Sequence, residues 1–159
     1  AAIFKSDDLQ GIRRYKGYVD ALCAYDIPID ESRIGWFDEN YYGSDRLNTI
    51  VERILELFGS YTAIICYNDF IAKIVCEILN KSGIHVPEQI SMASFDDLII
   101  ADQIGGGLTS AAHPRKLLGI EAATALIYKM ECDDTVEDKQ VILETKIVER
   151  SSIRTIGNN

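Results

Sequence analysis

The stretch Thr62–Asp97, TAIICYNDFIAKIVCEILNKSGIHVPEQISMASFDD, contains a complete strand–helix–strand unit. Its two apolar, β-branched runs, Thr62–Tyr67 and Ile90–Phe95, flank a segment with apolar residues at helical spacing. Both runs end in polar residues, Asn68-Asp69 and Asp96-Asp97. In an open parallel sheet, the carboxyl ends of neighbouring strands meet at one edge, where helix N-termini leave N–H groups unpaired. The stretch therefore predicts a polar binding cleft at that edge.

Helix and strand signals alternate on both sides of this unit. We expect further strands at Ile3–Lys5, Ile34–Phe37, Leu108–Ala111 and Val141–Val148, and helices from Asp7 or Asp8 to Ala24, from the cap Ser44 to Gly59 and from Pro114 to Met130. Asp69 is expected to cap the central helix, and Glu131–Lys139 is expected to be an acidic loop. This alternation predicts an α/β fold with a doubly wound parallel sheet.

Composition restricts the possible functions. The chain has 159 residues, the size of one domain, and no apolar run approaches the ~18 residues of a membrane span. Four cysteines show no spacing typical of a metal site, so we expect free thiols in a reducing, cytoplasmic setting: Cys23, Cys66, Cys76 and Cys132. With 25 acidic and 16 basic residues, the net charge is −9. Such a surface repels phosphate, so any DNA contact must lie in other sequence.

Four motifs resemble, in order and spacing, the effector-binding domain of LacI/GalR-type bacterial transcription regulators. They are CYNDFIA (66–72), GIHVPEQISMASFDD (83–97), LTSAAHPRKLLG (108–119) and ETKIVERSSI (144–153). IFKSDDLQGIRRYKGY (3–18) is similar to members that carry a GntR-type winged-helix DNA-binding head. The resemblance covers nearly all of the chain.

The resemblance implies a periplasmic-binding-protein-like fold in which an effector lies between two lobes. This chain corresponds mainly to the C-terminal lobe, and residues 110–130 would belong to the other lobe, whose remainder is absent with the DNA-binding domain. The implied function is sugar sensing by a dimeric repressor whose affinity for operator DNA changes when a monosaccharide, L-arabinose, binds. No cofactor and no catalysis are expected.

The resemblance also points to the residues that bind the sugar. Arg14, in the RxxG sequence of the first helix, would donate to ligand hydroxyls through its planar fork. Asp96, in FDD, would accept two hydroxyl hydrogens of a vicinal diol. Asn68 offers a donor and an acceptor together, and Asp8 and Gln10 stand at contact positions before the first helix. Arg13 and Asp97 fit better as an exposed arginine and a turn cap.

Two further residues complete the expected site. The family uses an aromatic ring after the second strand to stack on the sugar, and Phe37 is chosen over Trp36 for this role. His113 precedes a proline where the family often carries Gln or His, and its ring would bond a hydroxyl from the hinge side.

Other functions fit the sequence less well. A response-regulator receiver needs a Lys-Pro pair near its end, and the chain has none. A dinucleotide enzyme needs GxGxxG between a strand and a helix, and Gly105–Gly107 has neither that spacing nor that position. A periplasmic sugar-binding protein shares the fold and remains the alternative, although unpatterned cysteines and the regulator-like motifs favour a repressor.

Overall fold

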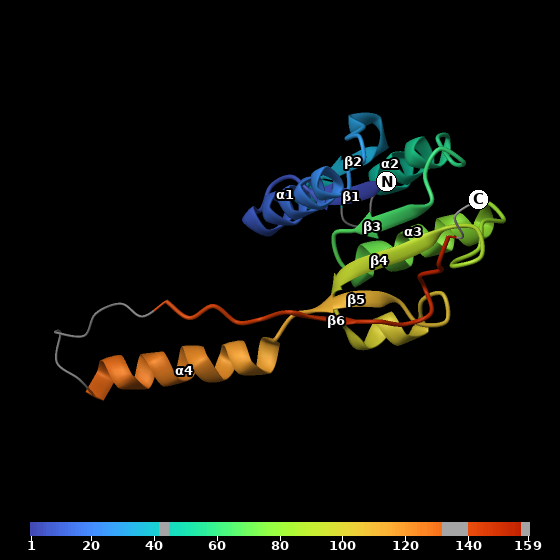
Figure 1. The fold of residues 1–159 in the computed structure, drawn as a ribbon. Helices are drawn as coiled ribbons and strands as arrows, with labels where there is room; N and C mark the ends of the chain where they lie inside the picture. Colours follow the sequence, from blue (N-terminus) through green and yellow to red (C-terminus); the bar gives the residue numbers. More distant parts are fainter. Residues whose placement is uncertain (42–44, 132–139, 157–159) are drawn as a thin grey trace.

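The computed structural model describes residues 1–41, 45–131 and 140–156. They form a six-stranded sheet in which the first five strands are parallel and the last is antiparallel. Its strand order is β2 (Ile34–Phe37), β1 (Ala2–Lys5), β3 (Ala63–Cys66), β4 (Ser91–Asp96), β5 (Thr109–Ala112) and β6 (Lys146–Val148). The predicted α/β fold is confirmed, and the sheet is parallel as predicted except at β6. Its strands run side by side in Figure 1.

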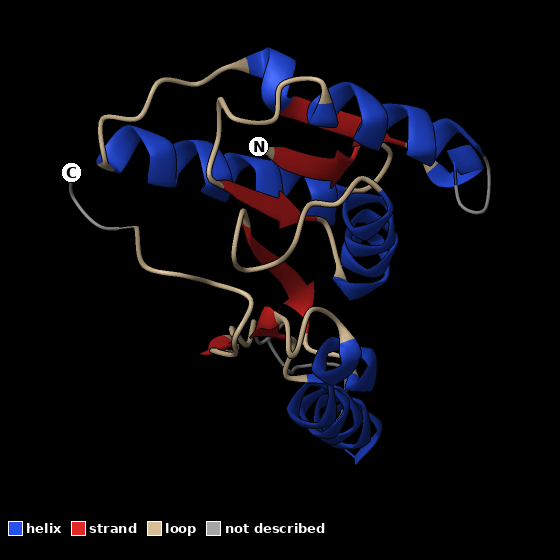
Figure 2. Cartoon of the chain, turned by 90° about the vertical axis from the view of Figure 1, so that its right-hand side faces the viewer, coloured by secondary structure: helices blue, strands red, loops and turns tan. Residues whose placement is uncertain are grey.

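Helices cover both faces of the sheet (Figure 2). α1 (Leu9–Ala24) packs on one face, where its residues Tyr15 and Tyr18 surround Phe4 of β1. α2 (Asp45–Leu55) and α3 (Asp69–Lys81) pack together on the other face. Alternate residues of each strand therefore enter two different cores, because successive side chains of a strand point to opposite faces.

The larger core lies under α2 and α3. Its fully buried members come from three strands and both helices and include Ile3, Ile54, Ile64, Ile71, Val75, Leu79, Ile90 and Met92. Burying a side chain of this size contributes about 1.5–3 kcal/mol relative to exposure. This core fixes the strands whose carboxyl ends carry the polar residues.

The start of α1 lies directly against the end of β1. Gly11 is buried there, and a Cβ atom on it would lie 1.9 Å from the carbonyl oxygen of Lys5. Only glycine permits this approach. The close contact brings the next turn of the helix, with Arg14, over the carboxyl edge of the sheet.

The C-terminal segment is fastened to the sheet by two side chains of the ETKIVERSSI motif. The Ser152 hydroxyl donates to Met92 O at 2.6 Å and accepts from Thr109 N at 2.8 Å, so it bridges β4 and β5. Arg150 pairs with Asp97 and Asp102, at 2.8 Å each. Part of this motif is therefore structural.

Helix α4 (Arg115–Glu131) extends away from the sheet, as Figure 1 shows, and contains no buried residue. The exposed apolar side chains on it are Leu117, Leu118, Ile120, Leu126, Ile127, Tyr128 and Met130. The expected strand Val141–Val148 is too long, because only Lys146–Val148 pairs with β5. The expected cap Ser44, the residues 132–139 of the acidic loop, and Cys132 lie outside the described residues.

Three short 3₁₀ helices complete the described structure, at Glu31–Arg33, Glu39–Tyr41 and Ile99–Gln103. The third follows β4 and leads to the glycines before β5. In the described part of the chain, no helix is both long and apolar enough to cross a membrane.

Candidate functional site

The carboxyl ends of β1, β3, β4 and β5 bring the polar residues of the motifs to one edge. Asp8 follows β1, Asn68 follows β3, Asp96 ends β4 and His113 follows β5. β3 and β4 are neighbours in the sheet, so Asn68 and Asp96 stand at adjacent strand ends. This arrangement is the one predicted from the sequence.

Arg14 lies at the centre of this edge. Its Nη2 atom is 2.8 Å from Asp96 Oδ1, and its Nη1 atom donates to Tyr67 O at 2.5 Å. The guanidinium carbon lies 4.7 Å from the ring centroids of both Tyr67 and Phe95. Only 12% of the Arg14 side chain and 24% of the Asp96 side chain are exposed. Two rings and three hydrogen-bonding groups, Gln10 included at 3.4 Å, thus fix the arginine in one orientation.

Asp96 retains an acceptor for a ligand. Its Oδ1 atom is occupied by Arg14, whereas among the described residues no hydrogen-bond partner lies on Oδ2. Asp96 and Asp97 both have left-handed backbone, with φ of 97° and 48°. Residues with a Cβ rarely adopt this conformation, and it is concentrated at binding sites.

Asp8 supports the site through hydrogen bonds to the start of α1 and to Tyr67. It caps α1, with Oδ1 accepting from Gly11 N at 2.6 Å, and its Oδ2 accepts from the Tyr67 hydroxyl at 2.6 Å. Burial acts to raise the pKa of Asp8, but these two hydrogen bonds and the nearby Lys5 ammonium outweigh it, so the pKa is lowered. Lys5 Nζ lies 3.2 Å from Asp7 and 3.6 Å from Asp8. Gln10, one turn before Arg14, is exposed.

The structure corrects the assignment of the cap of α3. Asn68 is the cap, with Oδ1 accepting from Ile71 N at 3.0 Å, and Asn68 is only 9% exposed. Asp69, the expected cap, is fully buried and accepts from Ser94, Ser110 and Leu98. Both residue types cap helices well, so the sequence leaves a one-residue ambiguity. With Oδ1 engaged in the cap, Asn68 can offer a ligand its Nδ2 group.

Phe37 also lies elsewhere than expected. Its ring is 1% exposed and packs edge-to-face on Tyr67, with centroids 5.6 Å apart, inside the larger core. It therefore presents no ring face for a sugar to stack on. Strand alternation is the reason, because Phe37 points towards α2 and Trp36 towards α1, where it contacts Phe4 at 5.9 Å.

Two rings at this edge were missed in the sequence. Tyr67 and Phe95 each immediately precede a polar strand end, and together they enclose Arg14. Each ring stands one residue before a predicted ligand-binding residue, Tyr67 before Asn68 and Phe95 before Asp96. That position in the motifs already indicated that the rings lie near the site.

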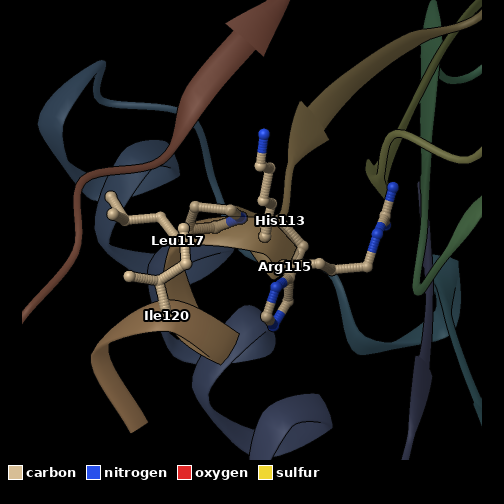
Figure 3. Close-up of a pocket in the computed structure, with 6 residues that line it drawn as sticks. His113, Arg115, Leu117 and Ile120 are labelled. Atoms are coloured by element: carbon tan, nitrogen blue, oxygen red, sulfur yellow. The ribbon is translucent and has the colours of Figure 1, made fainter. Parts of the chain in front are cut away.

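Arg115 was missed too. It is exposed at the first turn of α4, and it donates to Asp96 O at 2.5 Å and to Asp97 O at 3.0 Å. Figure 3 shows it near His113, with Leu117 on the first turn of α4 and Ile120 on the next, lining a pocket at the start of the helix. His113 donates its backbone N–H to Asp96 O at 3.5 Å, and its buried Nδ1 atom lacks a hydrogen-bond partner among the described residues.

Residues 1–153 match the family of periplasmic binding protein-like domains, and the chain belongs to this family. The predicted relationship to effector-binding domains of LacI/GalR-type regulators is confirmed by the relatives.

An arabinose metabolism transcriptional repressor from Geobacillus stearothermophilus is 30% identical over 159 residues, which is 98% of this chain and 43% of that protein. A repressor of the same name from Halalkalibacterium halodurans is 30% identical over 94% of this chain and 41% of its own length. The structure of the transcriptional regulator CelR in complex with cellobiose superposes with a TM-score of 0.83 at 27% identity, over 96% of this chain and 46% of that one. The chain thus spans less than half the length of these relatives.

Proposed function

We propose that this chain is the sugar-sensing part of a bacterial transcriptional repressor, with a monosaccharide bound at the edge formed by Arg14 and Asp96. The observation that carries the proposal is the Arg14–Asp96 ion pair, held between the Tyr67 and Phe95 rings where the strands end. The relatives support it, since they are named as transcriptional regulators and one was solved with cellobiose.

The chemistry of this edge suits a neutral, polyhydroxylated ligand. Arg14 and Asp96 cancel each other's charge, so a charged ligand gains little from the pair. The Asp96 Oδ2 atom can accept a hydroxyl hydrogen while Arg14 keeps Oδ1 in place. Hydrogen bonds between a hydroxyl and a charged group contribute about 1.5–3 kcal/mol each, provided that water is excluded. Asp8, Gln10, Asn68 and His113 lie at the same edge of the sheet and are proposed to share in ligand contact.

L-arabinose is the first ligand to test, because the two curated relatives described above are repressors of arabinose metabolism. The acidic net charge of −9 disfavours DNA contact by this chain, so operator binding is assigned to a further part of a cytoplasmic homodimer. By linkage, sugar and operator must weaken each other's binding equally, typically by 1–3 kcal/mol.

The second wall of the cleft is proposed to come from another lobe, to which residues 110–130 belong. α4 exposes its apolar side chains in this structure, and such a helix requires a packing partner. Arg115 joins α4 to the turn that carries Asp96, so a ligand at Asp96 lies next to the connection between the lobes.

Calorimetric titration of the full-length protein with pentoses and hexoses tests the proposal. We expect one sugar to bind, and Arg14→Ala and Asp96→Asn each to lose at least ~2 kcal/mol of affinity. Arg13→Ala, which removes the exposed neighbouring arginine, is the matched control and should bind normally. Gel shifts with operator DNA should show release by the same sugar. Normal sugar titrations for both site variants would contradict the assignment.

A further inference from the structure

Asp69 is a buried carboxylate that does not reach the cleft. It has 0% exposure at the first residue of α3. Its Oδ1 atom accepts from the hydroxyls of Ser94 on β4 and Ser110 on β5, the latter at 2.8 Å, and its Oδ2 atom accepts from Leu98 N at 2.6 Å. One side chain after β3 therefore bonds to β4, to β5 and to the turn that follows β4.

That turn is the one that presents Asp96. Its residues Asp96 and Asp97 have φ of 97° and 48°, a backbone conformation that residues with a Cβ rarely adopt and that surrounding contacts stabilise where it occurs. The hydroxyl of Ser110 donates to Asp69 and accepts from Asp97 N at 3.0 Å. The N–H groups of Asp97 and Leu98 are thus both directed into the buried Asp69–Ser110 pair.

The arginines that bond this turn from other elements are more exposed than Asp69. Arg115 bonds the carbonyls of Asp96 and Asp97 from an exposed position, and Arg150 pairs with the Asp97 side chain. Hydrogen bonds to a charged group are stronger where water is excluded, so the fully buried carboxylate contributes the most rigid of these restraints.

We propose that Asp69 is a positioning residue for ligand binding. It holds the Asp96–Asp97 turn in its left-handed conformation, which directs the Asp96 carboxylate towards Arg14 and the cleft. This rests on the proposed function, because it takes Asp96 as the ligand acceptor. Asparagine at position 69 has the same shape, but its amide can no longer accept from the two serines and from Leu98 N together.

The first test needs no ligand. Amide hydrogen exchange is compared in full-length wild type, Asp69→Asn and the control Asp20→Asn, which changes an exposed aspartate of α1. In Asp69→Asn, the amides of Asp97 and Leu98 should exchange at least about tenfold faster, as expected for local opening. The Met92 amide, bonded to Ser152 O at 2.8 Å, should keep its protection. Unchanged exchange at Asp97 and Leu98 would overturn the proposal.

The second test asks whether Asp69 acts through Asp96. Affinity for L-arabinose is measured by NMR titration for Asp69→Asn, Asp96→Asn and the double variant. We expect Asp69→Asn to weaken binding about tenfold alone and less than about twofold when Asp96 is already changed, since coupled residues give non-additive effects. Losses that simply multiply would show a general structural role and reject the proposal.

Failure of the proposed function and failure of the role proposed for Asp69 give different results. If the wild-type protein binds no sugar in the panel, the proposed function fails, and the exchange experiment alone decides whether Asp69 holds the turn. If Asp69→Asn does not fold, Ser110→Ala removes the hydroxyl that joins Asp69 to Asp97 N and contacts Ser94, and it leaves the bond from Leu98 N to Asp69 in place. Faster exchange at Asp97 with unchanged exchange at Leu98 supports the proposal, whereas unchanged exchange at Asp97 rejects it.

Discussion

Replacing Arg14 by alanine should reduce both ligand affinity and stability. The side chain is only 12% exposed, pairs with Asp96 at 2.8 Å and fills the space between two rings. Breaking a fully buried ion pair costs about 3–5 kcal/mol, and the 24% exposure of the Asp96 side chain lets water offset part of that loss. We therefore expect a loss of about 2–3 kcal/mol in the free energy of unfolding.

Urea denaturation followed by the fluorescence of Trp36, the one tryptophan of the chain, measures this loss. Arg14→Lys keeps the charge but cannot donate to Asp96 and Tyr67 O together, so its stability should lie between those of alanine and wild type. Arg13→Ala should stay within ~0.5 kcal/mol of wild type. The reasoning is refuted if Arg14→Ala unfolds at the same urea concentration as Arg13→Ala.

Three other predictions concern packing, pH and association. Gly11→Ala should lower the free energy of unfolding by about 1–3 kcal/mol, because its Cβ would lie 1.9 Å from Lys5 O. Gly17→Ala has open space around it and should stabilise α1 by about 0.5–1 kcal/mol. Thermal unfolding of both variants measures the difference. Because the pKa of Asp8 is lowered in the folded state, Asp8 contributes stability that is complete above its unfolded pKa of about 3.9. This contribution is lost as the pH falls through the lower folded pKa. The free energy of unfolding, measured with urea at several acidic pH values, should therefore fall less with pH in Asp8→Asn than in wild type. The 159-residue chain by itself should self-associate through the exposed apolar side chains of α4 and do so less in Leu126→Lys; light scattering that shows a wild-type monomer would contradict this.

The sequence by itself determined the order of elements and the edge that holds the site. The apolar runs, with their period of two or 3.6 residues and their glycine or acidic boundaries, predict the five strands that the structure shows to be parallel. Neighbouring parallel strands have their carboxyl ends at the same edge of the sheet. This is why the sequence alone places Asn68 and Asp96 at adjacent strand ends. The extent of the last strand could not be predicted, because Val141–Thr145 has the residues of a strand but pairs with no strand among the described residues.

The roles of individual side chains at that edge depended on contacts between distant parts of the chain. Asp69 is buried because Ser94 and Ser110 face it from two other strands, 25 and 41 residues further along. Phe37 is in the core because the pleat turns it towards α2, and Tyr67 and Phe95 become the partners of Arg14 because α1 crosses their strand ends. Local sequence limits which residues can cap, pair or pack, but only the packed sheet and helices decide which of them meet, since each such contact joins residues that are remote in the chain.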